Sequence, residues 1–289
     1  TRRSSLISIN TTRNVTGQTG ADSKTKTGKD MKKTLLAIAI STAAAAASAD
    51  YQMEASAFYG QGEVGDAVDY DVMGVAGRYN FESVDTSKGP HAEAAFLDKS
   101  SSVGFGYNSL EPDVAGADDV DSFDFDVRVV TDTNLIIEAA YEESEAGDDE
   151  SDTFGVGVGT YLNDNTDIVV SYQTTDDDGE DIDQLNVAVH GVNPLTQGAT
   201  LAYDASLSYV DTDDDSGHMI ELGATYYFNK DLGVGLSADL TEVGDYNTDT
   251  VSLDVSYFPQ PNVELMAAYF DQGGDVDADG IMFGAAVRF

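Results

Sequence analysis

The chain has no cysteine and no tryptophan, and only 14 of its 289 residues are basic. Without cysteine, a disulfide framework and a thiolate metal site are both excluded. Eight of the basic residues and two of the 53 acidic residues precede Asp50, which leaves six basic and 51 acidic residues from there onward, a formal charge near −45. Because so few cations could neutralise phosphates, nucleic-acid binding is excluded in practice.

The amino-terminal part has only a short apolar run, Leu35–Ile40, which could not cross a bilayer as a helix. It follows two lysines and precedes Ala47-Ser48-Ala49, the order typical of a secretory signal peptide. We therefore expect a signal peptide at 31–49 and a mature, exported protein at 50–289. Residues 1–30 are then a disordered upstream segment outside the mature protein, and the alternative is a genuine disordered tail before an internal signal.

Strong acidity is typical of disordered chains and of halophilic soluble proteins. Neither class explains fifteen Tyr, twelve Phe and a regular alternation of apolar and polar residues. Alternating runs recur from Tyr51 to the end, joined in turn by short, turn-like connections and by acidic ones such as 146–152 and 211–217. This order predicts an all-β, antiparallel up-and-down barrel. The predicted strands are 51–60, 69–81, 90–107, 122–130, 135–144, 153–161, 167–175, 182–191, 200–210, 218–228, 232–242, 249–258, 263–271 and 280–289.

This list gives fourteen strands, with 12 or 16 as alternatives, and the run 90–107 is interpreted as one long or bent strand. The longest acidic-side connection is then about 108–121. Period-two alternation reads the same for a soluble barrel and a membrane barrel. The export signal, a polar face poor in Lys, and Tyr and Phe near the strand ends favour a transmembrane barrel with two aromatic girdles. In that case Val251 and Leu253 face lipid and Asp254 faces a polar lumen.

The inward face then carries ten acidic and three basic residues, and seven of the acids have no candidate partner. The excess favours cations in the pore through the field of fixed charges, whereas full pairing within the wall would leave little effect on flow. The candidate pore-lining residues are Glu54, Arg78, Asp124, Asp126, Arg128, Glu138, Glu142, Asp204, Glu221, Asp239, Asp254, Glu264 and Arg288.

The last nine residues, 281–289, alternate and end on Phe289. This ending resembles the closing strand of bacterial outer-membrane barrels. The resemblance implies that Phe289 is the signal read by the barrel-assembly machinery. The stretch 79–97, Tyr-Asn-Phe-Glu-Ser-Val-Asp-Thr-Ser-Lys-Gly-Pro-His-Ala-Glu-Ala-Ala-Phe-Leu, resembles the putative general bacterial porins. Glu82-Ser83 depart from that family, which usually has Asn-Pro there. The resemblance implies a passive pore without a cofactor.

The sequence contains weaker indications of two other functions, metal binding and catalysis. Asp275, Asp277 and Asp279 match the opening of a calcium loop, but Ala286 stands where the bidentate Glu belongs. They and other acidic clusters remain weak candidates for Ca²⁺ or Mg²⁺, with a solvated acidic rim preferred. The spacing of the three histidines predicts no Ser–His or Asp–His pair at one depth, so no catalysis is expected. The first strand begins almost at the cleavage site, which leaves no room for an N-terminal plug.

The sequence therefore predicts an outer-membrane porin, a passive diffusion channel for small hydrophilic solutes and ions with a preference for cations. The alternative is a structural or adhesion barrel with divalent-cation-binding acidic loops and no significant transport. The expected partners are outer-membrane lipid and lipopolysaccharide, the assembly machinery and small solutes, with a homotrimer possible and the bacterial outer membrane as the location.

Overall fold

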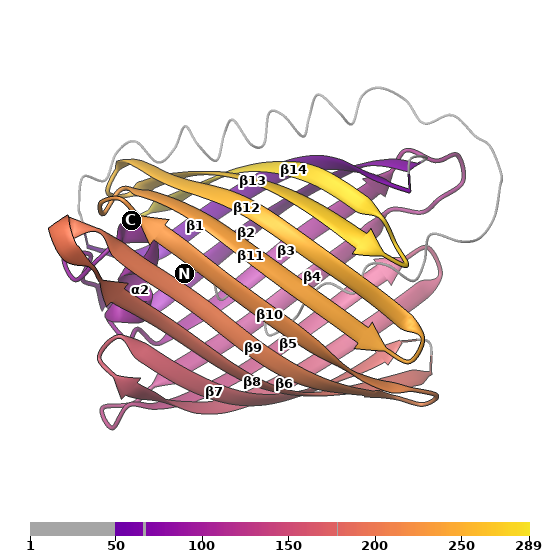
Figure 1. Ribbon diagram of the computed structural model, residues 1–289, viewed down its shortest axis with the longest axis horizontal. Helices are drawn as coiled ribbons and strands as arrows, with labels where there is room; N and C mark the ends of the chain where they lie inside the picture. The colour runs from indigo at the N-terminus through magenta and orange to yellow at the C-terminus, as the bar shows by residue number, and fades with distance from the viewer. Residues whose placement is uncertain (1–49, 66–67, 178) are drawn as a thin grey trace.

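The protein is a closed barrel of fourteen antiparallel strands (Figure 1). A computed structural model describes residues 50–65, 68–177 and 179–289. The predicted upstream segment 1–30 and the predicted signal peptide 31–49 lie outside these residues. The strands follow one another around the barrel in chain order, and β1 closes it by pairing with β14. The prediction of fourteen strands is confirmed, and the alternatives of 12 and 16 are wrong.

Every predicted run except the third coincides with one strand, and most strands extend beyond the predicted ends by one to four residues. The strands are β1 (Tyr51–Val64), β2 (Val68–Val84), β3 (Ser102–Pro112), β4 (Val120–Val130), β5 (Leu135–Ala146), β6 (Asp149–Asn163), β7 (Thr166–Asp177), β8 (Glu180–Pro194), β9 (Thr200–Thr212), β10 (Ser216–Tyr227), β11 (Leu232–Val243), β12 (Tyr246–Gln260), β13 (Val263–Gly274) and β14 (Ala278–Arg288).

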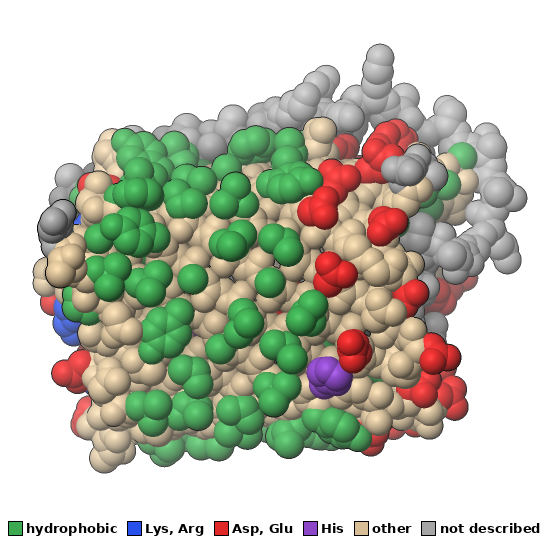
Figure 2. Space-filling model, viewed as in Figure 1, with side chains coloured by type: hydrophobic (Ala, Val, Ile, Leu, Met, Phe, Trp, Pro, Cys, Tyr) green, Lys and Arg blue, Asp and Glu red, His purple; other side chains and the backbone are tan. Residues whose placement is uncertain are grey.

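The apolar face of the strands points outward. On β12, Val251 and Leu253 are 47% and 49% exposed, whereas Asp254, the residue after Leu253, is 8% exposed. Figure 2 shows the same arrangement over a whole face, where apolar side chains cover the wall between the two rims. This is the distribution of a membrane barrel, with an apolar band against lipid and a polar interior.

Acidic side chains gather at the barrel end opposite the short helix α2 (Figures 1 and 2). At the border of this region, outward tyrosines donate hydrogen bonds to carboxylates: Tyr107 to Asp121 at 2.8 Å and Tyr172 to Asp183 at 2.6 Å. Tyrosine favours such a boundary because its ring is apolar and its hydroxyl needs a polar partner. These pairs support the prediction of an aromatic girdle on this side.

The acidic connections are shorter than the sequence indicated. The segment 146–152 was assigned to a loop, but only Gly147 and Asp148 lie outside β5 and β6, which pair up to Ala146 and Asp149. Gly147 supplies a backbone with φ of 66°, which a tight hairpin requires. Likewise, β3 extends to Pro112, so the connection to β4 is 113–119 and not 108–121. The acids therefore stand on strands that continue beyond the apolar band.

The prediction of one long strand over 90–107 is wrong. Residues 85–101 leave the wall between β2 and β3 and fold into a 3-10 turn, η1 (His91–Glu93), and a single helical turn, α2 (Ala94–Leu97). Pro90 removes a backbone donor just before the turn, and Lys99, with φ of 56°, ends the helical path. This segment is called the plug below.

No helix among the described residues is long and apolar enough to span a membrane.

Candidate functional site: the lumen and its plug

The barrel encloses a cavity of about 340 Å³. Its walls come from β2 to β12, and the inner side of the plug contributes Glu93, Ala95 and Phe96. Eight of the thirteen predicted pore-lining residues border it: Arg78, Asp126, Arg128, Glu138, Asp204, Glu221, Asp239 and Asp254. The other five lie on the same inward face of their strands, as their pairing with these residues or with inward neighbours shows: Glu54, Asp124, Glu142, Glu264 and Arg288.

Two of the three arginines form ion pairs in the wall. Arg78 on β2 donates two hydrogen bonds to Asp126 on β4, at 2.9 and 3.0 Å. Arg128 pairs with Glu138 on β5 and reaches Asp167 on β7 at 2.7 Å. Asp167 is fully buried, and no pattern in the sequence distinguishes it from the other acids. A buried carboxylate is tolerated only when it is paired. Arg128 provides this pairing and thereby links β4, β5 and β7.

Arg288 faces inward, but it is enclosed and not part of an open wall. It is 1% exposed, pairs with Glu54 at 2.6 Å and Glu264 at 3.2 Å, and lies over the rings of Tyr51 and Phe258. Because Glu54 lies on β1 and Arg288 on β14, this group stabilises the closure of the barrel. The backbone does the same, since the Phe289 carbonyl accepts hydrogen bonds from the first residues of β1.

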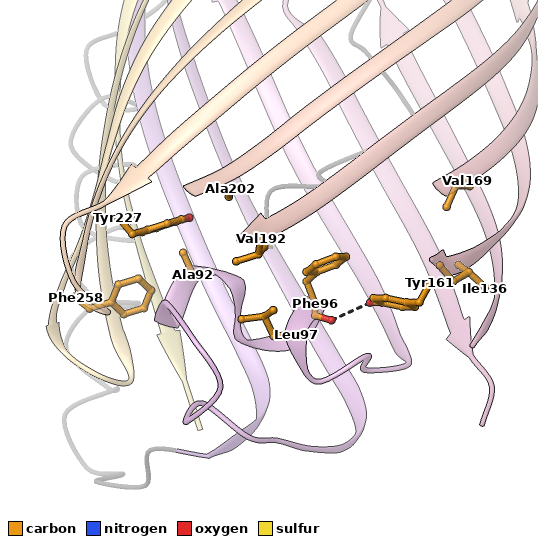
Figure 3. Packing of buried hydrophobic residues seen from close by; sticks show 10 residues of the cluster. All are labelled: Ala92, Phe96, Leu97, Ile136, Tyr161, Val169, Val192, Ala202, Tyr227 and Phe258. Atoms are coloured by element: carbon orange, nitrogen blue, oxygen red, sulfur yellow. Dashed lines mark hydrogen bonds between the residues drawn. The ribbon is translucent and has the colours of Figure 1, made fainter. Parts of the chain in front are cut away.

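The plug packs against the wall through apolar side chains (Figure 3). Ala92, Phe96 and Leu97 form one buried cluster with seven wall residues, Ile136, Tyr161, Val169, Val192, Ala202, Tyr227 and Phe258. Tyr161 also donates a hydrogen bond to the Phe96 carbonyl at 2.8 Å. Burying a side chain the size of Phe or Leu contributes about 2 kcal/mol, so Phe96 and Leu97 stabilise the packing of the plug against the wall.

One buried carboxylate of the plug, Glu93, binds two wall residues. It accepts a hydrogen bond from the Tyr227 hydroxyl at 2.8 Å and lies 3.2 Å from His190 Nε2. His190 Nδ1 is 2.5 Å from Asp204. Since both ring nitrogens face carboxylates, both carry a proton and the ring is cationic. Burial alone would raise the pKa of Glu93, but these partners outweigh it and lower the pKa to about 2.

The far edge of the plug is tied to the turns and to β14. Arg288 donates to the His91 carbonyl at 2.7 Å, and the His91 amide donates to the carbonyl of Lys230 in the β10–β11 turn. The His91 ring pairs with Asp231 at 3.2 Å, although burial lowers the pKa of this histidine. Lys99 donates to Asn134 and Asp164 in two further turns. The plug thus bridges the barrel at its short-turn end.

These contacts correct two expectations. The sequence spacing predicted no Asp–His pair at one depth, yet His190 and Asp204 are directly opposite in the β8–β9 pairing. The sequence pattern also predicted no plug, yet the internal connection 85–101 contributes residues that border the cavity. Both ring nitrogens of His190 are bound to carboxylates, so this pair has the geometry of an anchor and not of a general base acting on a hydroxyl nucleophile.

Four of the ten inward acids form no ion pair with a basic residue of the described chain. Asp124 and Glu142 are directly opposite in the β4–β5 pairing, and Glu221 and Asp239 are directly opposite in the β10–β11 pairing. We call these the two acid pairs. Seven acids without a partner were predicted, and the count is too high: Arg288 has two carboxylate partners, His190 pairs with Asp204, and Asp254 has a further interaction.

Within residues 50–65, 68–177 and 179–289, no group of three or more His, Asp or Glu side chains gathers as a metal site would need. The three aspartates that resemble a calcium loop are not brought together. Asp275 instead accepts hydrogen bonds from the Asn247 amide and side chain, which joins two hairpins. The family and fold described next are those of proteins that typically have no cofactor.

A family model described as "Putative general bacterial porin" matches residues 29–212. Among solved structures, the outer membrane protein Omp33 of Acinetobacter baumannii is similar, with 21% identity and a TM-score of 0.61. The alignment covers 83% of this chain and 99% of that one. A bacterial polysaccharide outer membrane secretin aligns with a TM-score of 0.52 and 10% identity, over 83% of this chain and 99% of that one. At these identities the structures show the fold alone. No curated protein matches the sequence.

Proposed function

This chain belongs to the putative general bacterial porin family, and from that premise we propose that it is a passive outer-membrane channel for small hydrophilic solutes and ions that favours cations. Membership and fold support the outer-membrane porin channel itself. The preference for cations rests on one observation, the two acid pairs without basic partners. The three arginines that could oppose them are occupied by Asp126, by Glu138 and Asp167, and by Glu54 and Glu264.

The two acid pairs lie at equal depth on different walls. Asp124 and Glu142 are six and seven residues from the strand ends Val130 and Leu135 at the β4–β5 turn. Glu221 and Asp239 are at the same distances from the ends of β10 and β11 at the β10–β11 turn. Like charges directly opposite repel each other, and a passing cation relieves that repulsion at both places.

The expected selectivity is modest. A carboxylate roughly 8 Å from an ion interacts with it by about 0.5 kcal/mol at the dielectric constant of water. Four carboxylates would contribute about 2 kcal/mol, which screening over a Debye length of about 10 Å at 0.1 M salt reduces. We therefore expect cations to permeate about 3 to 10 times more readily than anions of similar size.

Neutralising the acid pairs tests this proposal. A variant with Asp124→Asn, Glu142→Gln, Glu221→Gln and Asp239→Asn should lose most of its cation preference in planar-bilayer recordings with a salt gradient. The matched control removes four rim charges instead, as Asp148→Asn, Glu150→Gln, Asp213→Asn and Asp214→Asn. An equal loss in both variants would assign selectivity to overall charge. Folded protein that forms no channels would leave the structural or adhesion role as the remaining function.

Several partners follow from the location as proposals. The apolar band fits outer-membrane lipid, and the acidic rim beyond it fits the zone of the lipopolysaccharide headgroups. The terminal strand ending at Phe289, which is 51% exposed, is available to the barrel-assembly machinery. Association into a homotrimer is a further proposal, which cross-linking of the protein in its membrane would test.

A further inference from the structure

Part of the inward face is apolar, although the sequence predicts a polar lumen. Phe58, Val72, Met266, Phe270 and Met282 occupy the same side of β1, β2, β13 and β14 as the buried ion pairs of Arg288 and the inward Arg78. We call these five residues the apolar strip. They are half-buried, which shows that the lumen does not close over them as a packed core would.

The strip is continuous across the four strands because glycines lie between its members. A Cβ added to Gly74 would lie 2.4 Å from Phe58 Cε1, and one added to Gly60 would lie 2.5 Å from Met282 Cγ and 3.0 Å from Val72 Cγ1. An inward Cβ points into the lumen, so the side chains that it would meet extend along the inner wall. The missing Cβ atoms let the rings and thioethers lie flat against the backbone.

The plug does not cover this strip. The apolar cluster that buries the plug draws its wall residues from β5 to β10 and from β12, and none of the five residues belongs to it. The smaller buried cluster around Ala94 and Ala95 contains only Tyr51 and Val84 from the wall. Among the described residues, the strip is therefore an apolar surface without a packed partner.

The strip lies between the two acid pairs. In the barrel order, one strand (β3) separates it from Asp124 on β4, and one strand (β12) separates it from Asp239 on β11. In the register, Asp124 is opposite Gly106 and Gly106 is opposite Ala76, which is one inward position from Gly74. Two strand spacings of about 4.8 Å and an offset of two residues place Phe270 roughly 12 Å from Asp239, and an offset of four residues places Val72 roughly 16 Å from Asp124.

We propose that the apolar strip and the acid pairs together select organic cations that carry an apolar group, such as alkylammonium and arylammonium ions. This inference rests on the proposed channel and names its preferred solute class. The ammonium group faces a carboxylate while the apolar group covers the strip, where Phe58 and Phe270 also offer ring faces. The charge complementarity comes from the acids, and the inward side chains of Phe270 and Asp239 shorten the backbone separation of about 12 Å that the ion spans.

The first test needs only the unmodified protein. Bi-ionic potentials in planar bilayers give the permeability of methyl-, propyl-, pentyl- and benzylammonium relative to ammonium. A simple hydrophilic pore would admit these ions less readily as they grow. The inference predicts that permeability, or the affinity with which each ion blocks the potassium current, rises from methyl to pentyl and benzyl. A steady fall in both quantities along the series would overturn it.

The second test removes part of the strip. Phe58→Ser should lower the affinity for benzylammonium about fivefold, the effect of losing one ring contact, with the potassium current kept. The control is Gln173→Ala, a change on β7 at an inward position away from the strip. If Phe58→Ser does not fold, Phe270→Ser serves in its place. Equal affinity in variant and parent would overturn the inference while leaving the cation channel in place, whereas an absence of channels in the parent would refute the proposed function instead.

Discussion

Replacing Glu93 by Gln is expected to release the plug from the barrel wall. The substitution keeps the size of the side chain and removes its charge, so the His190 ring and the Tyr227 hydroxyl lose an ionised acceptor. The lowering of the Glu93 pKa from 4.5 to about 2 measures how strongly this site favours the carboxylate. At about 1.4 kcal/mol for each pKa unit, the anchor is worth about 3 kcal/mol.

A loss of this size should show in the plug before it shows in the barrel. The wall keeps its backbone pairing, whereas the plug is held mainly by side-chain contacts and opens more often when one of them is lost. An equilibrium constant changed by 3 kcal/mol corresponds to about a hundredfold more opening. The assay uses the absence of natural cysteine: Ala95→Cys, on the buried side of the plug, provides a single thiol whose reaction with a maleimide reports opening.

The thiol should react much faster when Glu93→Gln is present, and single-channel conductance should increase or fluctuate more. Glu82→Gln is the control, because this exposed acid at the end of β2 also loses one charge. Equal labelling rates in the Glu93 variant, its control and the parent would refute the assignment of Glu93 as the anchor.

Three further predictions concern pH, the wall and the lipid face. Because the pKa of Glu93 is lowered, its stabilisation of the plug is complete above about pH 4.5 and is lost as the pH falls toward about 2. Maleimide labelling is slow in acid, so single-channel conductance is recorded over this range. A conductance that does not change between about pH 4.5 and about pH 2 would refute the prediction. Arg128→Ala removes the ion pair from the buried Asp167 and should destabilise the folded barrel by about 3 to 5 kcal/mol in urea titrations. A loss below about 1 kcal/mol would show that this ion pair is dispensable. Leu253→Asp places a charge against lipid and should cost about 2 kcal/mol of folding free energy in bilayers. Ser252→Asp, on the inward face next to it, should cost far less. Equal costs for the two variants would contradict the assignment of the two faces.

The wall of the barrel was predictable because its signal is local. Alternation of period two identifies each strand, and turn residues mark its ends, so a run such as Val251 to Tyr257 could be assigned from a few neighbours. The direction of the faces needed the export signal and the composition of the polar side, since alternation alone leaves it open. The predicted strands are too short, because Asp-rich segments such as 146–152 have a composition that also suits a loop.

The contents of the lumen were not predictable in the same way. The pairing of His190 with Asp204 and Glu93 joins residues on two strands and in the plug, and only the closed fold brings them together. The stretch 90–97 did carry a signal, since Pro90 and the Ala-rich run up to Leu97 break the alternation. The apolar strip was not predictable because its five members lie on four strands, and only the register of the closed barrel brings them side by side.

An acidic, conducting lumen underlies both proposals, and the reversal potential of the unmodified protein shows whether the barrel has one. Purified, folded protein is inserted into a planar bilayer between concentrated and dilute potassium chloride. The account predicts single channels with a reversal potential displaced toward the equilibrium potential of potassium. Displacement toward that of chloride, or folded protein that never conducts, would contradict it.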